Sequence, residues 1–286
     1  MKNFKYFIQY ILIIFLLLLF KIIGHKYSLI ISSKLFSFIG PFFRSKKIIY
    51  SNLTNVFPNL HELEKNRITR AMWGNYGKIL AEYIFIKNFR DSKLQHNIIV
   101  DGQEILEKIK ENKKPVIFIS GHFNNFELMA LHIDKSGIDL AAIYRPLNNK
   151  YLNKIIEKIR KSYICNKQVK KGIAGTKLLL KYFKEGTSIA LMIDQRVSQG
   201  IKSNFFNKKA STTSIPAQFV KKFKCDVVPI YIERINNLNF KITIKKPIKF
   251  SDSSSIDSIT NDLNKILEDM IIKNPEQWIW THNRWK

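Results

Sequence analysis

P-V-I-F-I-S-G-H-F-N-N-F-E, residues 115–127, is the stretch of the chain that indicates the fold. Pro115 to Ser120 is a short apolar run with β-branched residues, bounded by Pro and Gly, which predicts a buried strand. From Asn124 to Lys135 apolar residues recur at helical spacing, which predicts a helix that begins at Asn124 or Asn125. We therefore expect His122 on the turn between a strand and a helix.

The spacing of His122 and Glu127 is compatible with a catalytic pair, provided that the chain bends between them. On a continuous helix, side chains this far apart would point about 140° away from each other. If His122 precedes the helix and Glu127 lies in its first turn, the imidazole can turn back to the carboxylate. A carboxylate on Nδ1–H would fix the tautomer, leave Nε2 free to accept a proton and stabilise the imidazolium. The alternative is that Asn124 and Glu127 form only a capping box and that His122 is a loop histidine.

Strand and helix patterns alternate through the rest of the chain. The expected strands are Ile98–Val100, Leu140–Tyr144, Ser188–Ile193, Val227–Ile232 and Phe240–Ile244, and the expected helices are Gln103–Glu111, Asn148–Tyr163, Ala174–Phe183, Thr212–Phe223 and Asp257–Ile272. Residues 46–85 read as helices with a break at Phe57-Pro58. This alternation predicts an α/β fold, in which a mostly parallel mixed sheet is flanked by helices and functional loops follow the strands.

The N-terminus has the composition of a membrane anchor. Tyr6 to Phe20 is apolar apart from Gln9, and Ile22 and Ile23 extend the run past Lys21. This is nearly enough length to cross about 30 Å of hydrocarbon. No small-residue cleavage site follows, which favours an uncleaved anchor over a secretory signal. We predict an anchor at residues 1–25 and a single domain at residues 26–286, and we leave both a span and an interfacial placement open.

Basic residues follow this anchor at Lys34, Arg44, Lys46 and Lys47. The positive-inside bias therefore predicts that the domain lies on the cytoplasmic face of the membrane. Leu29 to Phe43 is a second apolar and aromatic stretch. It fits an amphipathic helix at the membrane interface or an ordinary core helix.

Composition narrows the possible partners without selecting one. The 286 residues include 48 Lys plus Arg and 22 Asp plus Glu, a formal charge of +26. This charge suits anionic lipid, a phosphorylated substrate, an acidic carrier protein or nucleic acid. Cys165 and Cys225 lack metal or redox spacing, and His122, Glu127 and His132 do not form H-E-x-x-H, so no disulfide framework and no metal site are predicted. The chain also lacks a G-x-S-x-G elbow, so we expect no acyl-enzyme nucleophile.

G-H-F-N-N-F-E resembles the His-x4-Glu signature of membrane acyltransferases, and further blocks support this resemblance in the same order. They are the D-Q-x-x-x-x-G loop that begins at Asp194 and the closing P-E-Q-W-I-W-T-H-N-R-W-K. Together these blocks resemble the late acyltransferases of lipid A biosynthesis, the lauroyl and myristoyl transferase family, over most of the chain after about residue 40. The resemblance implies a glycerolipid acyltransferase-like fold, no cofactor and a place at the bacterial inner membrane. It also implies acyl-acyl carrier protein as donor and a hydroxyl of a Kdo-bearing lipid A precursor as acceptor.

The resemblance gives roles to six residues. It implies that His122 is the general base and that Glu127 orients it, while Arg145, Arg160, Asp194 and Gln195 belong to the substrate-binding region. Arginine suits phosphate because its planar fork binds two oxygens and stays charged. The alternative interpretation of each arginine is a solvated surface residue. The alternative for Asp194 is a side chain that caps its own loop.

Two other functions compete with acyl transfer to lipid A. A glycerolipid or lysophospholipid acyltransferase would share the histidine motif, although that group usually carries Asp at its second position. A basic, membrane-tethered binding protein without catalysis would bind anionic lipid or nucleic acid in a strongly salt-dependent way. We expect membrane lipid and no nucleic acid as a partner. The closing tryptophans suit a membrane interface, and core packing of at least two of them is the simpler prediction.

Overall fold

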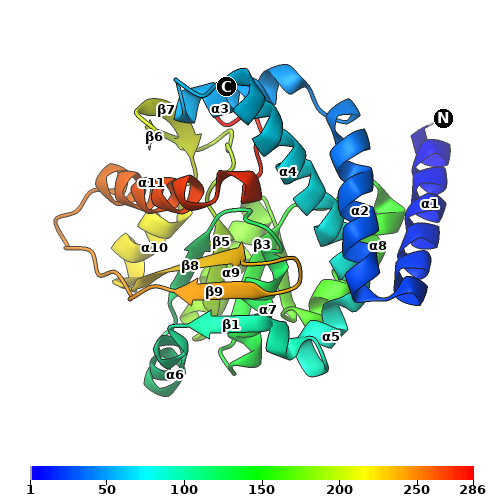
Figure 1. The fold of residues 1–286 in the computed structure, drawn as a ribbon. Coiled ribbons are helices and arrows are strands. Elements are labelled where there is room, and N and C mark those ends of the chain that lie inside the picture. The colour runs from blue at the N-terminus through cyan, green and yellow to red at the C-terminus, as the bar shows by residue number, and fades with distance from the viewer. Residues whose placement is uncertain (1) are drawn as a thin grey trace.

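The structure is a computed structural model that describes residues 2–286, with side chains from residue 3. A seven-stranded sheet lies at its centre, in the order β1-β9-β8-β2-β5-β3-β4 (Figure 1). Five of these strands run parallel, whereas β9 is antiparallel to β8 and β1 is parallel to β9. The strands are β1 (Ile98–Asp101), β2 (Ile117–Ser120), β3 (Leu140–Tyr144), β4 (Lys167–Lys170), β5 (Ser188–Met192), β8 (Val227–Arg234) and β9 (Phe240–Ile244). The predicted fold class is therefore confirmed.

Helices connect the parallel strands and cover the sheet. They are α6 (Gln103–Asn112), α7 (Glu127–Lys135), α8 (Lys150–Tyr163), α9 (Ile173–Lys184), α10 (Ile215–Phe223) and α11 (Ile256–Lys273). A short helix, α5 (Ile86–Asp91), packs against α7 and α8, while α10 packs against α11 and α9 lies on β3, β4 and β5. Parallel crossovers are right-handed, so the helices that lead towards β4 and those that return from it cover opposite faces.

The central strands β2 and β5 are neighbours whose outgoing connections leave in opposite directions. The chain passes from β2 through α7 to β3, on the β4 side of the sheet, and from β5 through α10 to β8, on the β1 side. α/β folds bind their ligands beyond the carboxyl ends of two such strands, so this edge of the sheet is where a site is expected. All four residues of β2 are buried, as its apolar sequence requires.

The N-terminal third is helical. It contains α1 (Lys2–Ile23), α2 (His25–Ile39), α3 (Lys46–Val56), α4 (Glu62–Glu82) and three short 3₁₀ turns, η1 (Gly40–Phe42), η2 (Tyr83–Phe85) and η3 (Gln95–Asn97). Residues 24, 40–45 and 57–61 separate these helices, so the break predicted at Phe57-Pro58 is confirmed. The long helices α2 and α4 lie side by side (Figure 1).

Gly77 allows α2 and α4 to approach so closely. Ser32 Oγ donates a hydrogen bond to the carbonyl of Gly77 at 2.5 Å. A Cβ at position 77 would lie 2.2 Å from the carbonyl oxygen of Ser32. No side chain larger than hydrogen fits there without moving the two helices apart.

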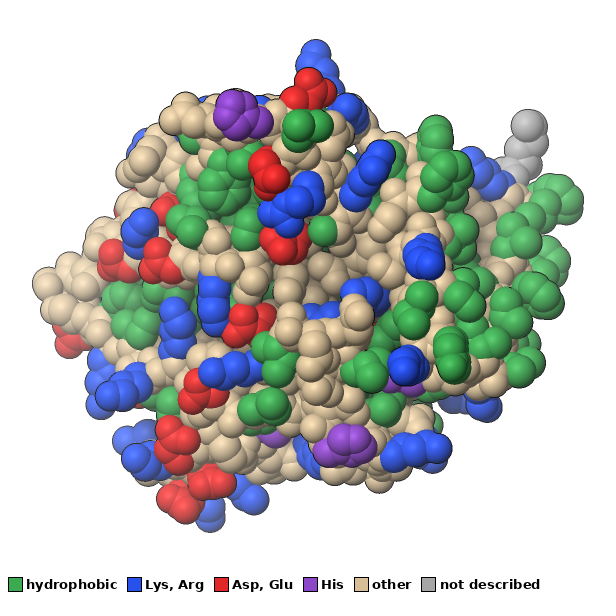
Figure 2. Space-filling model, viewed as in Figure 1, with side chains coloured by type: hydrophobic (Ala, Val, Ile, Leu, Met, Phe, Trp, Pro, Cys, Tyr) green, Lys and Arg blue, Asp and Glu red, His purple; other side chains and the backbone are tan. Residues whose placement is uncertain are grey.

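Helix α1 is long and apolar enough to cross a membrane, with a mean hydropathy of 2.5 in an 18-residue window within Asn3–Ile23. Little of it is buried, and Figure 2 shows hydrophobic side chains gathered over α1 and α2 on one side of the molecule. This agrees with the predicted anchor by length and composition. The second apolar stretch, Leu29 to Phe43, forms most of α2 and η1. It packs on α4 through one face and exposes apolar side chains on the other.

Three regions of the chain differ from the sequence prediction. Strand β4 was missed because Lys167–Lys170 is a polar edge strand without an apolar run. Strands β6 (Ile201–Phe205) and β7 (Lys208–Thr212) form a hairpin of their own, so the helix predicted from Thr212 begins only at Ile215. The helix predicted from Asn124 or Asn125 begins at Glu127, because Asn124 adopts a left-handed conformation with φ 42°. Asparagine tolerates this conformation better than most residues.

Candidate active site

His122 and Asp194 meet beyond the carboxyl ends of β2 and β5. His122 follows β2, Asp194 follows β5, and His122 Nδ1 lies 2.7 Å from Asp194 Oδ1. The other carboxylate oxygen of Asp194 accepts hydrogen bonds from the backbone N–H of His122 and from Trp278 Nε1–H, both at 2.9 Å. Three hydrogen bonds therefore hold the Asp194 carboxylate, and two of them come from His122.

Asp194 stays ionised although its side chain is only 1% exposed. Burial by itself would raise its pKa, but the interaction with His122 and the N–H donors outweigh burial and lower the pKa to about 2. An ionised carboxylate only accepts hydrogen bonds, so Nδ1 of His122 carries the proton in the neutral ring. Within residues 2–286, no hydrogen bond occupies Nε2, and the His122 side chain is 20% exposed. This nitrogen is the basic atom of the site.

Two consecutive asparagines shape the turn that carries His122. Asn124 donates through its backbone N–H to the carbonyl of Gln277 and through Nδ2 to Gln277 Oε1, both at 2.9 Å. Asn125 donates through Nδ2 to Glu82 Oε2 at 2.9 Å. Both asparagines are 2% exposed, so these bonds supply partners for amide N–H groups that are cut off from water.

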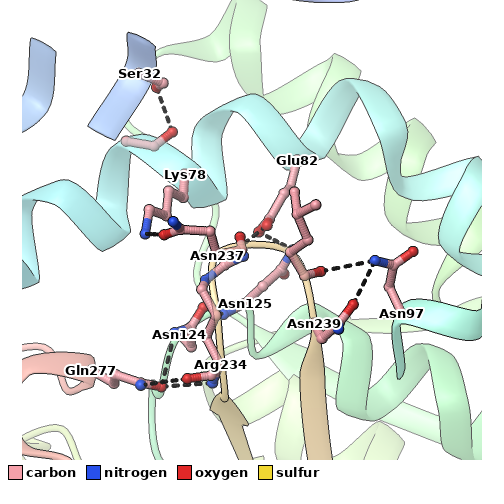
Figure 3. A network of polar contacts seen from close by, with 12 residues as sticks. Ser32, Lys78, Glu82, Asn97, Asn124, Asn125, Arg234, Asn237, Asn239 and Gln277 are labelled. Atoms are coloured by element: carbon pink, nitrogen blue, oxygen red, sulfur yellow. Dashed lines mark hydrogen bonds and ion pairs between the residues drawn. The ribbon is translucent and has the colours of Figure 1, made fainter. Parts of the chain in front are cut away.

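The partners of the two asparagines belong to one buried network, shown in Figure 3. Glu82 is completely buried at the end of α4 and forms an ion pair with Arg234 at 2.7 Å. Arg234 lies at the end of β8, and its backbone N–H and carbonyl bind the side-chain amide of Gln277 at 2.8 and 3.0 Å. Gln277 belongs to the short turn η4 (Pro275–Gln277). Elements from three distant parts of the sequence thus fix the turn between His122 and Glu127.

Glu127 has different partners from those expected. Its Oε1 accepts hydrogen bonds from Arg160 Nε at 2.8 Å and from the hydroxyl of Tyr83. Burial disfavours the charge of Arg160, but the Glu127 carboxylate outweighs burial and raises the pKa of the guanidinium. Burial and Glu127 also raise the pKa of Tyr83, so its hydroxyl stays protonated and donates.

The predicted contact between His122 and Glu127 is therefore absent from the described residues, and Asp194 occupies the position assigned to Glu127. Glu127 does lie in the first turn of α7, as the contact required. Its carboxylate instead receives Arg160 and Tyr83, and the His122 ring turns to Asp194 on the neighbouring strand end. The alternative capping box is not formed either, because Asn124 Oδ1 accepts from the N–H of Asn125 and α7 has no side-chain cap.

The four predicted substrate-binding residues are spread around this site. Arg160 points at Glu127 and not at open solvent, while Asp194 is bonded to His122. Arg145 is exposed just after β3, and Gln195 is partly exposed next to Asp194. Their roles in binding substrate stay predictions.

Sequence reasoning missed two further residues of the site. Trp278 is 2% exposed, which confirms core packing, and it also donates to Asp194. His282 Nε2 accepts a hydrogen bond from the backbone N–H of Arg196 at 3.0 Å, next to Asp194. Burial, together with the charges of Arg284 and His122, lowers the pKa of His282 although Asp194 opposes the shift. Both residues lie in the closing block, more than 80 positions from Asp194, so only the resemblance of that block pointed to them.

The fold and this site define the class of protein: an α/β enzyme with a carboxylate-supported histidine at the carboxyl edge of its sheet. The family model described as "Bacterial lipid A biosynthesis acyltransferase" matches residues 1–286, and the chain belongs to this family. It is a transferase, an acyltransferase of lipid A biosynthesis.

Individual relatives are distant but similar over most of their length. The chain is 22% identical to the lipid A biosynthesis lauroyltransferase of Escherichia coli, over 85% of this chain and 79% of that protein. It is 25% identical to a lipid A biosynthesis acyltransferase of Haemophilus influenzae, over 88% and 81%. It is 22% identical to the lipid A biosynthesis myristoyltransferase of Escherichia coli, over 82% and 73%.

Proposed function

We propose that this protein transfers a fatty acyl chain from acyl-acyl carrier protein to a hydroxyl of a Kdo-bearing lipid A precursor. Membership of the lipid A acyltransferase family supports the late acylation step. The observation that carries the mechanism is the buried, ionised Asp194 on Nδ1 of His122, which leaves Nε2 of a partly exposed side chain free to accept a proton. The identities of the acyl donor and of the acceptor are both part of this proposal.

The reaction proceeds without a covalent enzyme intermediate. Nε2 of His122 takes the proton from the acceptor hydroxyl as its oxygen attacks the thioester carbonyl carbon. Asp194 stabilises the imidazolium that forms and keeps the ring in place. When the carbon–sulfur bond breaks, the imidazolium returns the proton to the carrier's thiolate. Asp194 thus takes the orienting role that the sequence pattern suggested for Glu127.

In this proposal Glu127 acts through Arg160. Two side chains from different elements, Arg160 on α8 and Tyr83 in η2, converge on the Glu127 carboxylate next to the catalytic turn. The pair holds the guanidinium in a fixed orientation, 5.5 Å from the ring of Tyr144 at the end of β3. Exposed Arg145 follows Tyr144 and supplies a free cation for a phosphate of either substrate.

The membrane placement follows from the chemistry of the acceptor, which is a lipid. In this proposal apolar α1 anchors the chain at the inner membrane, and the basic residues after it support a domain on the cytoplasmic side. The formal charge of +26 suits an acidic carrier protein and an anionic membrane surface.

Mass spectrometry of the reaction product tests the function. Purified protein, a defined acyl-acyl carrier protein and the tetra-acyl precursor should yield a penta-acyl product. His122→Ala should lower the rate by about 10²- to 10⁴-fold, the usual contribution of a general base. His96→Ala, which removes an exposed histidine of η3, is the matched control and should keep the wild-type rate.

Two results would contradict the proposal. Near-normal transfer by His122→Ala would reject the mechanism. Acylation of a lysophospholipid in place of the lipid A precursor would reject the acceptor and leave the mechanism standing.

A further inference from the structure

One face of α1 is apolar, exposed and continuous from end to end. Its large side chains are between 43% and 82% exposed and follow at alternating steps of four and three residues: Phe4, Ile8, Ile11, Phe15, Leu18 and Ile22. This spacing places them on one stripe of the helix.

The exposed apolar surface continues onto α2 and η1, which return antiparallel to α1 after the turn at Gly24 (Figure 1). Its largest members are Tyr27, Phe38, Phe42 and Phe43, each more than 60% exposed. We call these residues and the α1 stripe the α1–α2 surface. Figure 2 shows this side as the main gathering of hydrophobic side chains in that view, with Lys and Arg at its margins.

A lipid bilayer is the occupant that fits this surface. An exposed apolar area of this extent marks a site of protein or membrane contact. The composition of α1 is that of a helix that enters hydrocarbon. Exposed Lys21, Lys26 and Lys34 on the same two helices suit anionic headgroups.

The opposite face of α1 is attached to the domain at both of its halves. Near its start, Asn149 Nδ2 donates to the carbonyl of Tyr6 at 2.8 Å, and Tyr10 packs on Tyr151 of α8 with ring centroids 5.8 Å apart. Near its end, Leu17 and Phe20 form a buried cluster with Leu29 of α2 and Ala81 of α4. About 21 Å of helix separates Tyr6 from Phe20, at 1.5 Å per residue.

If α1 crossed the membrane perpendicular to its plane, its contacts with the domain at Tyr6 and at Phe20 would lie on opposite sides of most of the bilayer. The start of α8 would then enter the hydrocarbon with Tyr6, and it carries Lys150, Lys154 and Lys158, all exposed. Ammonium groups at that depth are costly. The observed packing therefore suits a helix that lies along the membrane and not through it.

We propose that α1 lies in the plane of the cytoplasmic leaflet, with the α1–α2 surface against lipid and both ends of α1 on the cytoplasmic side. The inference rests on the membrane placement in the proposed function. It explains why α1 is apolar all round: protein covers one face and lipid covers the other. It also holds the domain against the surface from which a lipid acceptor must come.

Depth measurements on the full-length protein test the proposal. In a Cys165→Ala, Cys225→Ala background, a nitroxide label is attached at Phe4→Cys, Ile11→Cys or Ile22→Cys. The protein is reconstituted in vesicles of phosphatidylethanolamine and phosphatidylglycerol. Accessibility to oxygen and to a water-soluble nickel chelate then gives the depth of each label. Ile173→Cys, on exposed Ile173 of α9, is the water-facing control.

An in-plane helix places all three labels at a similar depth, about 5–10 Å below the headgroup boundary. A spanning helix places Ile11 more than about 10 Å deeper than Phe4 and Ile22, at 1.5 Å per residue, and this result would overturn the inference. In that case the protein would still float with the vesicles, so the proposed membrane placement would survive. Protein that fails to float overturns both proposals. If the labels were shielded from both reagents and their spectra showed dipolar broadening, the α1–α2 surface would bind a second copy of the chain. This result would also overturn the inference.

A second readout uses sidedness in cells. A membrane-impermeant maleimide added to the periplasm should not label Asn3→Cys if both ends of α1 are cytoplasmic. Labelling as strong as that of a periplasmic reference thiol would overturn the in-plane arrangement.

Discussion

In the proposed mechanism Asp194 makes His122 a directional base, because it fixes which ring nitrogen is free. Its carboxylate receives Nδ1–H, the backbone N–H of His122 and the indole N–H of Trp278. Replacing it with Asn keeps the shape but allows the amide to donate to the ring, which favours the other tautomer.

We expect Asp194→Asn to lower kcat by about 10²- to 10⁴-fold, the range of a lost general base, with a small change in KM. Steady-state kinetics with the acyl carrier donor measures both constants. Asp139→Asn, which alters an exposed carboxylate paired with Lys167, is the control and should leave kcat unchanged. If Glu127→Gln gave the large loss in kcat and Asp194→Asn did not, the pairing expected from the sequence would be right and the one in the structure wrong.

Asp194 also predicts how stability responds to acid. Its pKa falls from 3.8 to about 2 on folding, so its contribution to stability is present above about pH 4 and is lost as the pH falls towards 2. A shift of this size corresponds to about 2 kcal/mol. Urea unfolding in detergent should therefore show a stability gap between the wild-type protein and Asp194→Asn at pH 6, and this gap should shrink below pH 4. A constant gap down to pH 2 would contradict the assignment.

At the scale of elements, the buried network of Glu82, Arg234 and Gln277 holds the catalytic turn from behind. Asn125 is its direct link to that turn, through the hydrogen bond to Glu82. Asn125→Ala leaves a buried carboxylate with one partner fewer, which costs about 1–3 kcal/mol. Asn125→Asp places a second carboxylate against Glu82 and should be worse, because like charges disfavour each other.

We therefore expect kcat and the free energy of unfolding to fall in the order wild type, Asn125→Ala, Asn125→Asp. Kinetics and urea unfolding of the three proteins check the order. Asn239→Ala is the control, since Asn239 bonds to Asn97 beside the network and does not touch the turn. It should lower stability without lowering kcat, and an equal loss of kcat would show that the turn is not specially sensitive.

The contact between α2 and α4 gives a prediction in which two effects have opposite signs. In an exposed helix, Gly→Ala stabilises by about 1 kcal/mol through helix propensity. At Gly77 the new Cβ would lie 2.2 Å from a backbone oxygen of Ser32, and such overpacking costs about 1–3 kcal/mol or more. Gly77→Ala should therefore lower the free energy of unfolding, whereas Thr54→Ala on an exposed position of α3 should not. A stabilised Gly77→Ala protein would show that the helices can separate freely.

The elements that the sequence predicts well are those in which apolar residues recur at the regular spacing of a strand or a helix. Strand β9 was placed at its true ends and β2 within two residues, because their buried positions are apolar. Strand β4 could not be found, since K-Q-V-K offers no such signal at the edge of the sheet. In the site, the motif pointed to His122, but the carboxylate that contacts it belongs to Asp194, which is 72 residues away and is brought there by the pairing of β2 with β5. Glu127 pairs with Arg160 on α8, 33 residues further along the chain, and spacing within the motif does not reveal this partner.

At the scale of the whole molecule, the two proposals meet in the orientation of the chain on the membrane. In these proposals the α1–α2 surface lies against lipid, and the remaining surface faces the cytoplasm and the acyl carrier. With a formal charge of +26, the protein attracts acidic partners over a Debye length of about 10 Å at 0.1 M salt. Electrostatic attraction of this kind mainly speeds association.

We accordingly expect kcat/KM for acyl-acyl carrier protein to fall at least about tenfold as salt rises from 50 to 500 mM, because screening slows the encounter with an acidic donor. The measurement is the initial rate at low donor concentration across this salt range. A short acyl-pantetheine thioester without charged groups is the matched donor, and its kcat/KM should change little. Asp194→Asn with the full carrier should lose rate at every salt concentration but keep the same salt slope, because it alters the chemical step and not the encounter. Equal salt slopes for the charged and uncharged donors would instead place the salt effect on the lipid acceptor or the membrane, and the acidic carrier would no longer be the partner that the positive charge serves.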